Sequence, residues 1–230
     1  RLVPSMVLDT RAPPPAPSTQ PPTPKKKTGP ASPTPSPTRT EREQQPAVVS
    51  ARLYRHPDSQ VLEWVRGNSG DPRHAVIETR IAAQPAAVWF ADFTPDTITA
   101  RVRAVTSGGS ALGRVPVVVP YAIPDRDCGG HSQGGAPGLD AYDAWIDRFA
   151  AGLGSGDVIV ILEPDSVAQS ECLSAGERAD RFASLARAGR AFKAANPRAR
   201  VYYDAGHSGW NPPGKQAGWH AWDEMVQESF

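Results

Sequence analysis

The chain has 230 residues, of which 39% are hydrophobic, and its 25 basic and 24 acidic side chains leave a net charge of +1. This balance argues against a dedicated nucleic-acid surface, because such surfaces carry an excess of Lys and Arg. No apolar run approaches the length of about 20 residues that a helix needs to cross a bilayer, so no membrane span is expected.

Residues 1–48 are expected to form a disordered linker rich in Pro, Thr and Ser. They contain about half of the 25 prolines and few large apolar side chains after Leu8. Such a segment cannot bury enough apolar surface to offset the entropy of ordering its backbone. A lysine triplet at residues 25–27 could act as a nuclear signal or an anion-binding patch, but a simple tether is the favoured interpretation. A folded domain is expected over residues 49–230.

Strands and helices alternate through this expected domain. Strands are predicted at residues 88–93, 115–123, 158–162 and 200–204. Helices are predicted at residues 56–68, 95–106, 139–153, 175–195 and 216–228. Thr94 is expected to cap the second helix, and Ser174 with Glu177 matches the capping-box pattern of the fourth. Because no hairpin signal separates the strands, the pattern predicts an α/β fold with a parallel sheet. A closed β/α barrel needs roughly 250 residues, so half a barrel or an open sheet is expected.

Carboxylates directly follow two of the predicted strands. Asp125 and Asp127 come after the second strand, and Glu163 and Asp165 come after the third. The carboxyl ends of parallel strands carry the chemistry of barrel-type α/β enzymes. Two acids on neighbouring strand ends are also the minimum equipment for cleaving a glycosidic bond, so the pattern indicates a polysaccharide hydrolase. The fourth predicted strand is followed by further polar and aromatic candidates: Asp204, His207 and Trp210.

The chain has two cysteines, Cys128 and Cys172, and each follows one of the acid-bearing strands. A disulfide between them would close a loop of about 45 residues, worth on the order of 4 kcal/mol in the chain-entropy model. The alternative is a pair of free thiols in a cytosolic protein. A proline-rich tether and a cysteine in each loop favour the disulfide and a secreted protein.

Three longer motifs and two weaker ones resemble a known family. They are PDRDCGGHSQGGAP (124–137), LEPDS (162–166) and YYDAGHSGW (202–210), with EWVRGNSGDPR (63–73) and VWFADFTP (88–95) upstream. Together they resemble glycoside hydrolase family 6, the cellulases that hydrolyse β-1,4-glucan with inversion on a distorted parallel (β/α) barrel. The resemblance spans nearly all of residues 53–215. It implies that about the first half of this barrel is present, that cellulose or a related β-glucan is the substrate, and that the linker leads to a carbohydrate-binding module.

The same resemblance assigns the catalytic pair. Asp165 matches the general acid, which must hold a proton near the leaving-group oxygen. Asp127 matches a second aspartate whose negative charge raises the pKa of that acid. The alternative for Asp165 is a turn cap after the third strand. Glu163 and Asp125 are expected to be structural.

The resemblance also implies a set of residues around the sugar. The expected substrate-binding residues are Tyr121, Trp89, Asp204, His207 and Trp210. Plain core packing is the alternative for Tyr121 and Trp89. Two residues are expected to support the site: Arg126 through an ion pair with the acidic cluster, and Ser132 by handling water.

Other functions are compatible with parts of the sequence. His207 could bind zinc with His131, Cys128 or an aspartate, but no pair has tight metal-ligand spacing, so neither a metal nor another cofactor is expected. The short glycine-rich loop after Asp127 favours an open cleft and cleavage of internal bonds, and a cellobiohydrolase is the alternative within the family. A glucan-binding protein without activity and an unrelated α/β domain are the remaining alternatives.

Overall fold

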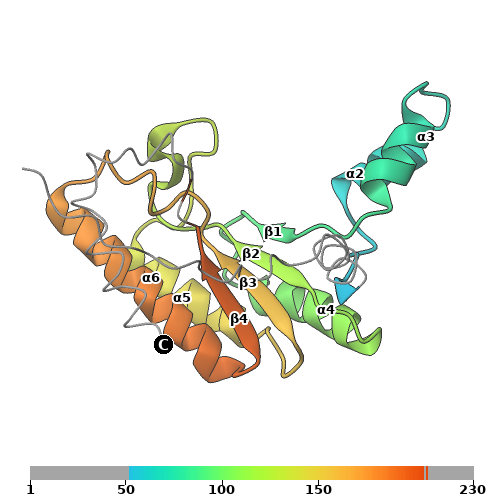
Figure 1. The fold of residues 1–230 in the computed structure, drawn as a ribbon. Helices are drawn as coiled ribbons and strands as arrows, with labels where there is room; N and C mark the ends of the chain where they lie inside the picture. Colours follow the sequence, from blue (N-terminus) through green and yellow to red (C-terminus); the bar gives the residue numbers. More distant parts are fainter. Residues whose placement is uncertain (1–51, 205, 207–230) are drawn as a thin grey trace, which may run out of the picture. The chain divides into compact units, whose positions relative to one another are not determined.

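The structure is a computed structural model of the chain, and it describes residues 52–204 and 206 (Figure 1). The expected linker at residues 1–48, the predicted helix at residues 216–228, His207 and Trp210 lie outside the described residues. The elements in chain order are α2 (Gln60–Gly67), α3 (His74–Ile77), η1 (Glu78–Ala82), β1 (Val88–Phe90), α4 (Ile98–Ala111), β2 (Val117–Pro120), η2 (Arg126–Gly129), α5 (Leu139–Ala150), β3 (Val158–Leu162), α6 (Ala175–Ala195) and β4 (Ala199–Tyr203).

The four described strands form one parallel sheet in the order β1-β2-β3-β4. Each strand therefore pairs with the next strand along the chain, as in a β/α barrel. Val118 lies opposite Val88 on one side and Val160 on the other, so the register is continuous across the first three strands. The predicted parallel α/β fold is confirmed.

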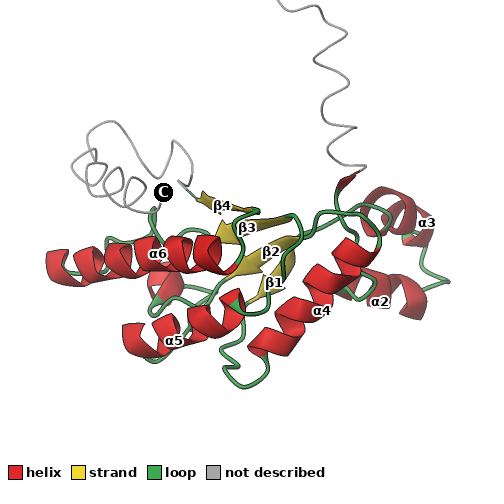
Figure 2. Ribbon diagram, turned by 90° about the horizontal axis from the view of Figure 1, so that it is seen from below, coloured by secondary structure: helices red, strands yellow, loops and turns green. Residues whose placement is uncertain are grey.

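Helices α4, α5 and α6 lie side by side along one face of the sheet (Figure 2). On β3 the side chains of Val158, Val160 and Leu162 are buried, and they alternate with less buried residues, as expected for a strand packed on helices on one face. Phe149 of α5 lies at the centre of this layer, with its ring 5.2 Å from that of Phe90 and 5.6 Å from that of a phenylalanine on α6. No helix in the described part of the chain is long and apolar enough to cross a membrane.

The predicted start of α6 is right, whereas the predicted start of α4 is not. At the start of α6, the backbone N–H of Ser174 donates to Glu177 and the N–H of Glu177 donates to the Ser174 hydroxyl, so the predicted capping box is confirmed. The cap predicted at Thr94 is wrong, because α4 begins at Ile98 after Thr97. The Thr94 hydroxyl instead accepts a hydrogen bond from Arg101.

One further boundary and two short helices differ from the sequence-based expectation. The first predicted helix begins later, at Gln60, because the Ser59 hydroxyl caps it. The short helices α3 and η1 were not predicted, since their apolar residues Val76 and Ile81 are exposed and show no buried periodicity.

Candidate active site

Two loops at the carboxyl ends of neighbouring strands carry the predicted acids. The β2 loop (residues 121–138) follows β2, and the β3 loop (residues 163–174) follows β3. Five residues other than glycine have a positive φ among the described residues, and all lie in these loops: Asp125, Asp127, Cys128, Glu163 and Asp165. This left-handed conformation costs of order 1–3 kcal/mol for each residue and is concentrated at functional sites. The backbone of both loops is thus strained where the carboxylates stand.

Asp165 lies close to the other two predicted site aspartates. Its backbone N–H donates to Oδ2 of Asp204 at 2.9 Å, which joins the β3 loop to the end of β4. Partial burial raises the pKa of the Asp165 carboxyl, and the negative charges of Asp204 and Asp127 raise it further. The structure therefore brings together the three aspartates that the sequence nominated, and their charges shift the pKa of Asp165 in the direction that a general acid requires.

Asp127 is held by the backbone that follows it. Its Oδ2 accepts a hydrogen bond from the N–H of Ser132 at 2.7 Å. A Cβ at Gly130 would lie 2.6 Å from the same oxygen, and a Cβ at Gly135 (φ +107°) would lie 2.1 Å from the carbonyl oxygen of Ile123. These glycines are required by close approach of the chain to itself, so packing explains the glycine-rich loop.

Arg126 does not form the ion pair expected of it. Within residues 52–204 no carboxylate lies close enough to its guanidinium for an ion pair. It donates instead to the carbonyl oxygens of Ala91 (2.7 Å), Ser132 (2.6 Å) and Tyr121, and its guanidinium lies 4.6 Å above the Tyr121 ring. The sequence-based prediction treated Arg126 only as a charge, whereas its donor groups brace the β2 loop.

Tyr121 and Trp89 meet at the same edge of the sheet. Their rings lie 5.4 Å apart in an edge-to-face contact. Tyr121 is 7% exposed, and burial raises the pKa of its hydroxyl. Trp89 is 52% exposed, although its neighbour Phe90 is buried on the helix side. Core packing is therefore a poor account of Trp89, which presents its ring on the opposite face of the sheet.

Glu163 is wholly buried, in agreement with the structural role expected for it. Its carboxylate accepts backbone N–H groups of Ala122 (2.9 Å) and Ile123 (3.0 Å), so it joins the start of the β3 loop to the start of the β2 loop. Burial raises the pKa of Glu163 to about 7 in spite of these hydrogen bonds.

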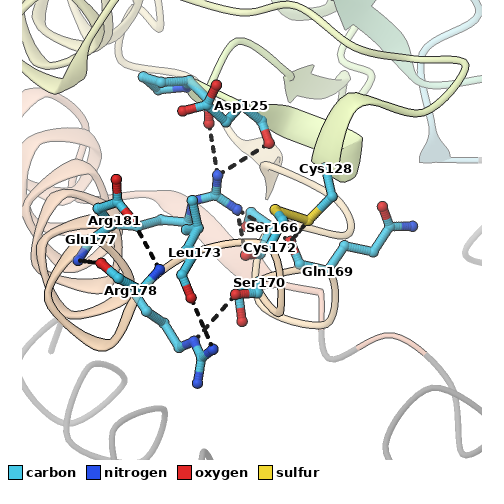
Figure 3. Close-up of a disulfide and its surroundings, with 12 residues drawn as sticks. Asp125, Cys128, Ser166, Gln169, Ser170, Cys172, Leu173, Glu177, Arg178 and Arg181 are labelled. Atoms are coloured by element: carbon cyan, nitrogen blue, oxygen red, sulfur yellow. Dashed lines mark hydrogen bonds between the residues drawn. A yellow bond between two sulfur atoms is a disulfide. The ribbon is translucent and has the colours of Figure 1, made fainter.

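The predicted disulfide between Cys128 and Cys172 is confirmed (Figure 3). It joins the two acid-bearing loops, with 5.7 Å between the Cα atoms. Cys128 therefore has no thiolate to offer a metal, which removes one ligand from the zinc alternative. The described residues contain no group of three His, Cys, Asp or Glu side chains arranged to hold a metal ion.

One residue that the sequence-based prediction missed, Arg181, lies on α6. Arg181 is buried and contacts both loops, as Figure 3 shows. The sequence could have indicated this role in one way. Arg181 falls on the expected apolar side of the predicted helix, and a charged group buried there must have a polar partner.

Comparison with known proteins decides the family. A family model described as "Glycosyl hydrolases family 6" matches residues 45–228. The chain belongs to glycosyl hydrolase family 6. The family 6 chain is 52% identical over 168 residues to Endoglucanase 1 of Streptomyces sp. (strain KSM-9), which covers 73% of the chain and 46% of that relative. It is 47% identical over 166 residues to Endoglucanase A of Thermobispora bispora, covering 72% of the chain and 36% of the relative.

A solved structure of the family has the same fold. It is the endoglucanase Cel6 from Mycobacterium tuberculosis in complex with methyl-cellobiosyl-4-deoxy-4-thio-β-D-cellobioside, with a TM-score of 0.67 and 33% identity. The match covers 77% of the family 6 chain and 57% of that protein. The chain thus spans less than half the length of the two curated relatives and somewhat more than half of this structure.

Proposed function

We propose that this chain contributes to the catalytic domain of a secreted cellulase that hydrolyses internal β-1,4-glucosidic bonds of cellulose or related β-glucans with inversion. The observation that carries the proposal is Asp165, a carboxyl whose pKa is raised by burial and by the charges of Asp204 and Asp127. Its position at the carboxyl edge of a parallel sheet is where such chemistry occurs. The endoglucanase names of the relatives support cleavage of internal bonds.

The reaction assigns a separate role to each acid. Protonated Asp165 gives its proton to the glycosidic oxygen as the bond from that oxygen to the anomeric carbon breaks. The negative charge of Asp127 keeps that proton on Asp165 before the reaction and stabilises the positive charge that develops on the sugar ring. Water attacks the anomeric carbon from the opposite face and loses its proton to a base there, so the new hemiacetal has inverted configuration.

The sugar contacts follow from the same edge of the sheet. Trp89 offers an exposed ring to the C–H face of a glucose unit, and Tyr121 lies edge-on beside it. Asp204 is proposed to bind sugar hydroxyls, together with His207 and Trp210 in the segment after β4. Ser132, next to Asp127 in space, is proposed to orient water.

The wider setting of the domain is also a proposal. A disulfide between the two acid-bearing loops supports an oxidising compartment, and hence secretion. We place a carbohydrate-binding module beyond the linker at residues 1–48, since a proline-rich tether keeps a second module close to an insoluble polymer.

The first test measures viscosity loss and reducing-end release on soluble carboxymethyl cellulose. Asp165→Asn should lower the rate by roughly 10²–10⁴-fold, as expected when a general acid is lost. Asp157→Asn is the matched control, because Asp157 lies before β3 at the far end of the strand and pairs with Arg198 at 3.0 Å. Activity that survives in Asp165→Asn, or falls equally in both variants, would contradict the proposal.

Product analysis separates the remaining alternatives. Mixed oligomers with a rapid fall in viscosity indicate cleavage of internal bonds, whereas cellobiose alone indicates a cellobiohydrolase. Binding to β-glucan without turnover, unchanged in Asp165→Asn, indicates a glucan-binding protein. Proton NMR of the first product should show the α-anomer, and a β-anomer would exclude inversion.

A further inference from the structure

The guanidinium of Arg181 lies between the two acid-bearing loops. Arg181 is on α6 and is 2% exposed. Its Nη2 donates to the carbonyl oxygens of Pro124 (2.7 Å) and Asp125 (3.2 Å) in the β2 loop. Its Nη1 donates to those of Ser166 (3.4 Å) and Gln169 (3.3 Å) in the β3 loop. Each terminal nitrogen thus serves a different loop, and the planar fork spans the gap between them (Figure 3).

Packing alone does not account for a charge at this position. No carboxylate in the described part of the chain lies within ion-pair distance of Arg181, and burial lowers the pKa of its guanidinium although Asp125 and Glu163 favour the cation. Burying a charge without an ion-pair partner is unfavourable, and an apolar side chain would fill the space at lower cost. The four carbonyl oxygens are therefore the reason for an arginine here.

The carbonyl groups that Arg181 holds lie next to the proposed catalytic acids. Asp125 is two residues before Asp127, and Ser166 directly follows Asp165. The backbone at Asp125, Asp127 and Asp165 has a positive φ, so these loops adopt a conformation that needs support from outside. A group that ties both loops to one helix fixes the distance between their side chains.

We propose that Arg181 is a positioning residue for the hydrolytic reaction, which holds the β2 loop against the β3 loop and so places Asp127 relative to Asp165. The proposal rests on the function proposed above for these two aspartates. A displacement of about 1 Å at reacting groups can lower a rate roughly 100-fold, so the loop-to-loop distance is an effective point of control.

The test compares Arg181→Lys with Arg178→Lys in the 230-residue chain. Lys keeps the charge but cannot span two loops with one ammonium group. Arg178 is the matched control: it stands three residues earlier on α6 and donates to the carbonyl oxygens of Ser170 and Leu173, both at 3.3 Å and both within the β3 loop. Arg181→Lys should lower kcat roughly 10- to 100-fold with KM little changed, whereas Arg178→Lys should keep kcat within about twofold.

The pH profile distinguishes positioning from a general loss of folded protein. The charges that face Asp165 come from Asp127 in the β2 loop and Asp204 after β4, with the Tyr121 hydroxyl nearby. If Arg181→Lys lets Asp127 move away, Asp165 loses its proton more readily and the alkaline limb of kcat/KM moves to lower pH. Partial unfolding would scale the profile without moving this limb, and Arg178→Lys should leave it in place.

A measurement that needs no hydrolysis separates the proposed role of Arg181 from the proposed function of the chain. Carbon-13 NMR of the Asp165 carboxyl should show titration at lower pH in Arg181→Lys than in the parent or in Arg178→Lys. If the parent hydrolyses no glucan, the proposed function fails while this titration still tests the placement of Asp127. If Arg181→Lys does not fold, Arg181→Gln, which removes the buried charge and reaches one loop, takes its place. Unchanged kcat and unchanged Asp165 titration, or equal changes in both arginine variants, would overturn the role of Arg181.

Discussion

Glu163 makes the stability of this domain depend on pH in a direction opposite to that of most carboxylates. Burial raises its pKa from the usual 4.5 to about 7, so the folded state keeps a proton that the unfolded state has lost. The stabilisation is complete below the unfolded pKa and is lost as the pH rises through the folded pKa. Each unit of pKa difference corresponds to about 1.4 kcal/mol, so the difference between 4.5 and about 7 corresponds to about 3 kcal/mol.

The assay is urea unfolding of the parent and of Glu163→Gln at intervals between about pH 4 and about pH 8. Gln keeps the size of the side chain but does not titrate, and its NH₂ group cannot accept the hydrogen bond that Oε1 of Glu163 accepts from the N–H of Ala122. The variant should be less stable throughout, and its deficit should shrink by about 3 kcal/mol as the pH rises. Glu171→Gln, an exposed carboxyl in the β3 loop, is the matched control. A deficit for Glu163→Gln that stays constant with pH would refute the reasoning.

Three further predictions use other parts of the site. Replacing both Cys128 and Cys172 by Ser should lower the free energy of unfolding by about 4 kcal/mol, measured in urea, because a cross-link over 44 residues no longer restricts the unfolded chain; no change would contradict it. Trp89→Ala should weaken cello-oligosaccharide binding roughly tenfold by calorimetry while Trp89→Phe keeps most of it, and equal losses would argue against ring stacking. Gly135→Ala should destabilise the fold by more than about 1 kcal/mol, because φ is +107° and a Cβ would collide with a carbonyl group; Gly67→Ala, which meets no atom within 4 Å, should not, and similar melting temperatures for the two would refute the requirement.

Local signals predicted the framework well. The alternation of apolar runs with helical segments indicated the parallel sheet, and the bounds of β3 agree with the predicted strand at residues 158–162. The capping box at Ser174 depends on residues three positions apart, which the sequence displays directly. The helix predicted from residue 95 begins later than expected. Thr94 is a residue type that often caps helices, but here the chain forms turns from Thr94 to Thr97 before the helix begins.

Contacts between distant residues could not be predicted in the same way. The three aspartates were nominated from their places after successive strands, but their closeness follows from the order of strands in the sheet. Arg126 donates to a carbonyl oxygen 35 positions away and Arg181 to one 57 positions away, and no pattern along the chain indicates such partners. Arg126 contacts carbonyl oxygens and not the expected carboxylates because of how the folded loops place those oxygens around it.

The positive φ angles at the acids decide how these positions can change. Asp and Asn occupy the left-handed region more readily than other residues with a Cβ. Asp→Asn at Asp127 or Asp165 therefore removes the carboxyl group without adding backbone strain. Ala would add a conformational penalty to the loss of the carboxyl, and a β-branched residue would add a larger one. At Asp127 and Asp165 we therefore expect Asp, Asn and Gly to be tolerated best, although Cys128 and Glu163 also have a positive φ in these loops. A library that explores new catalytic groups here must first redesign the turn that carries them.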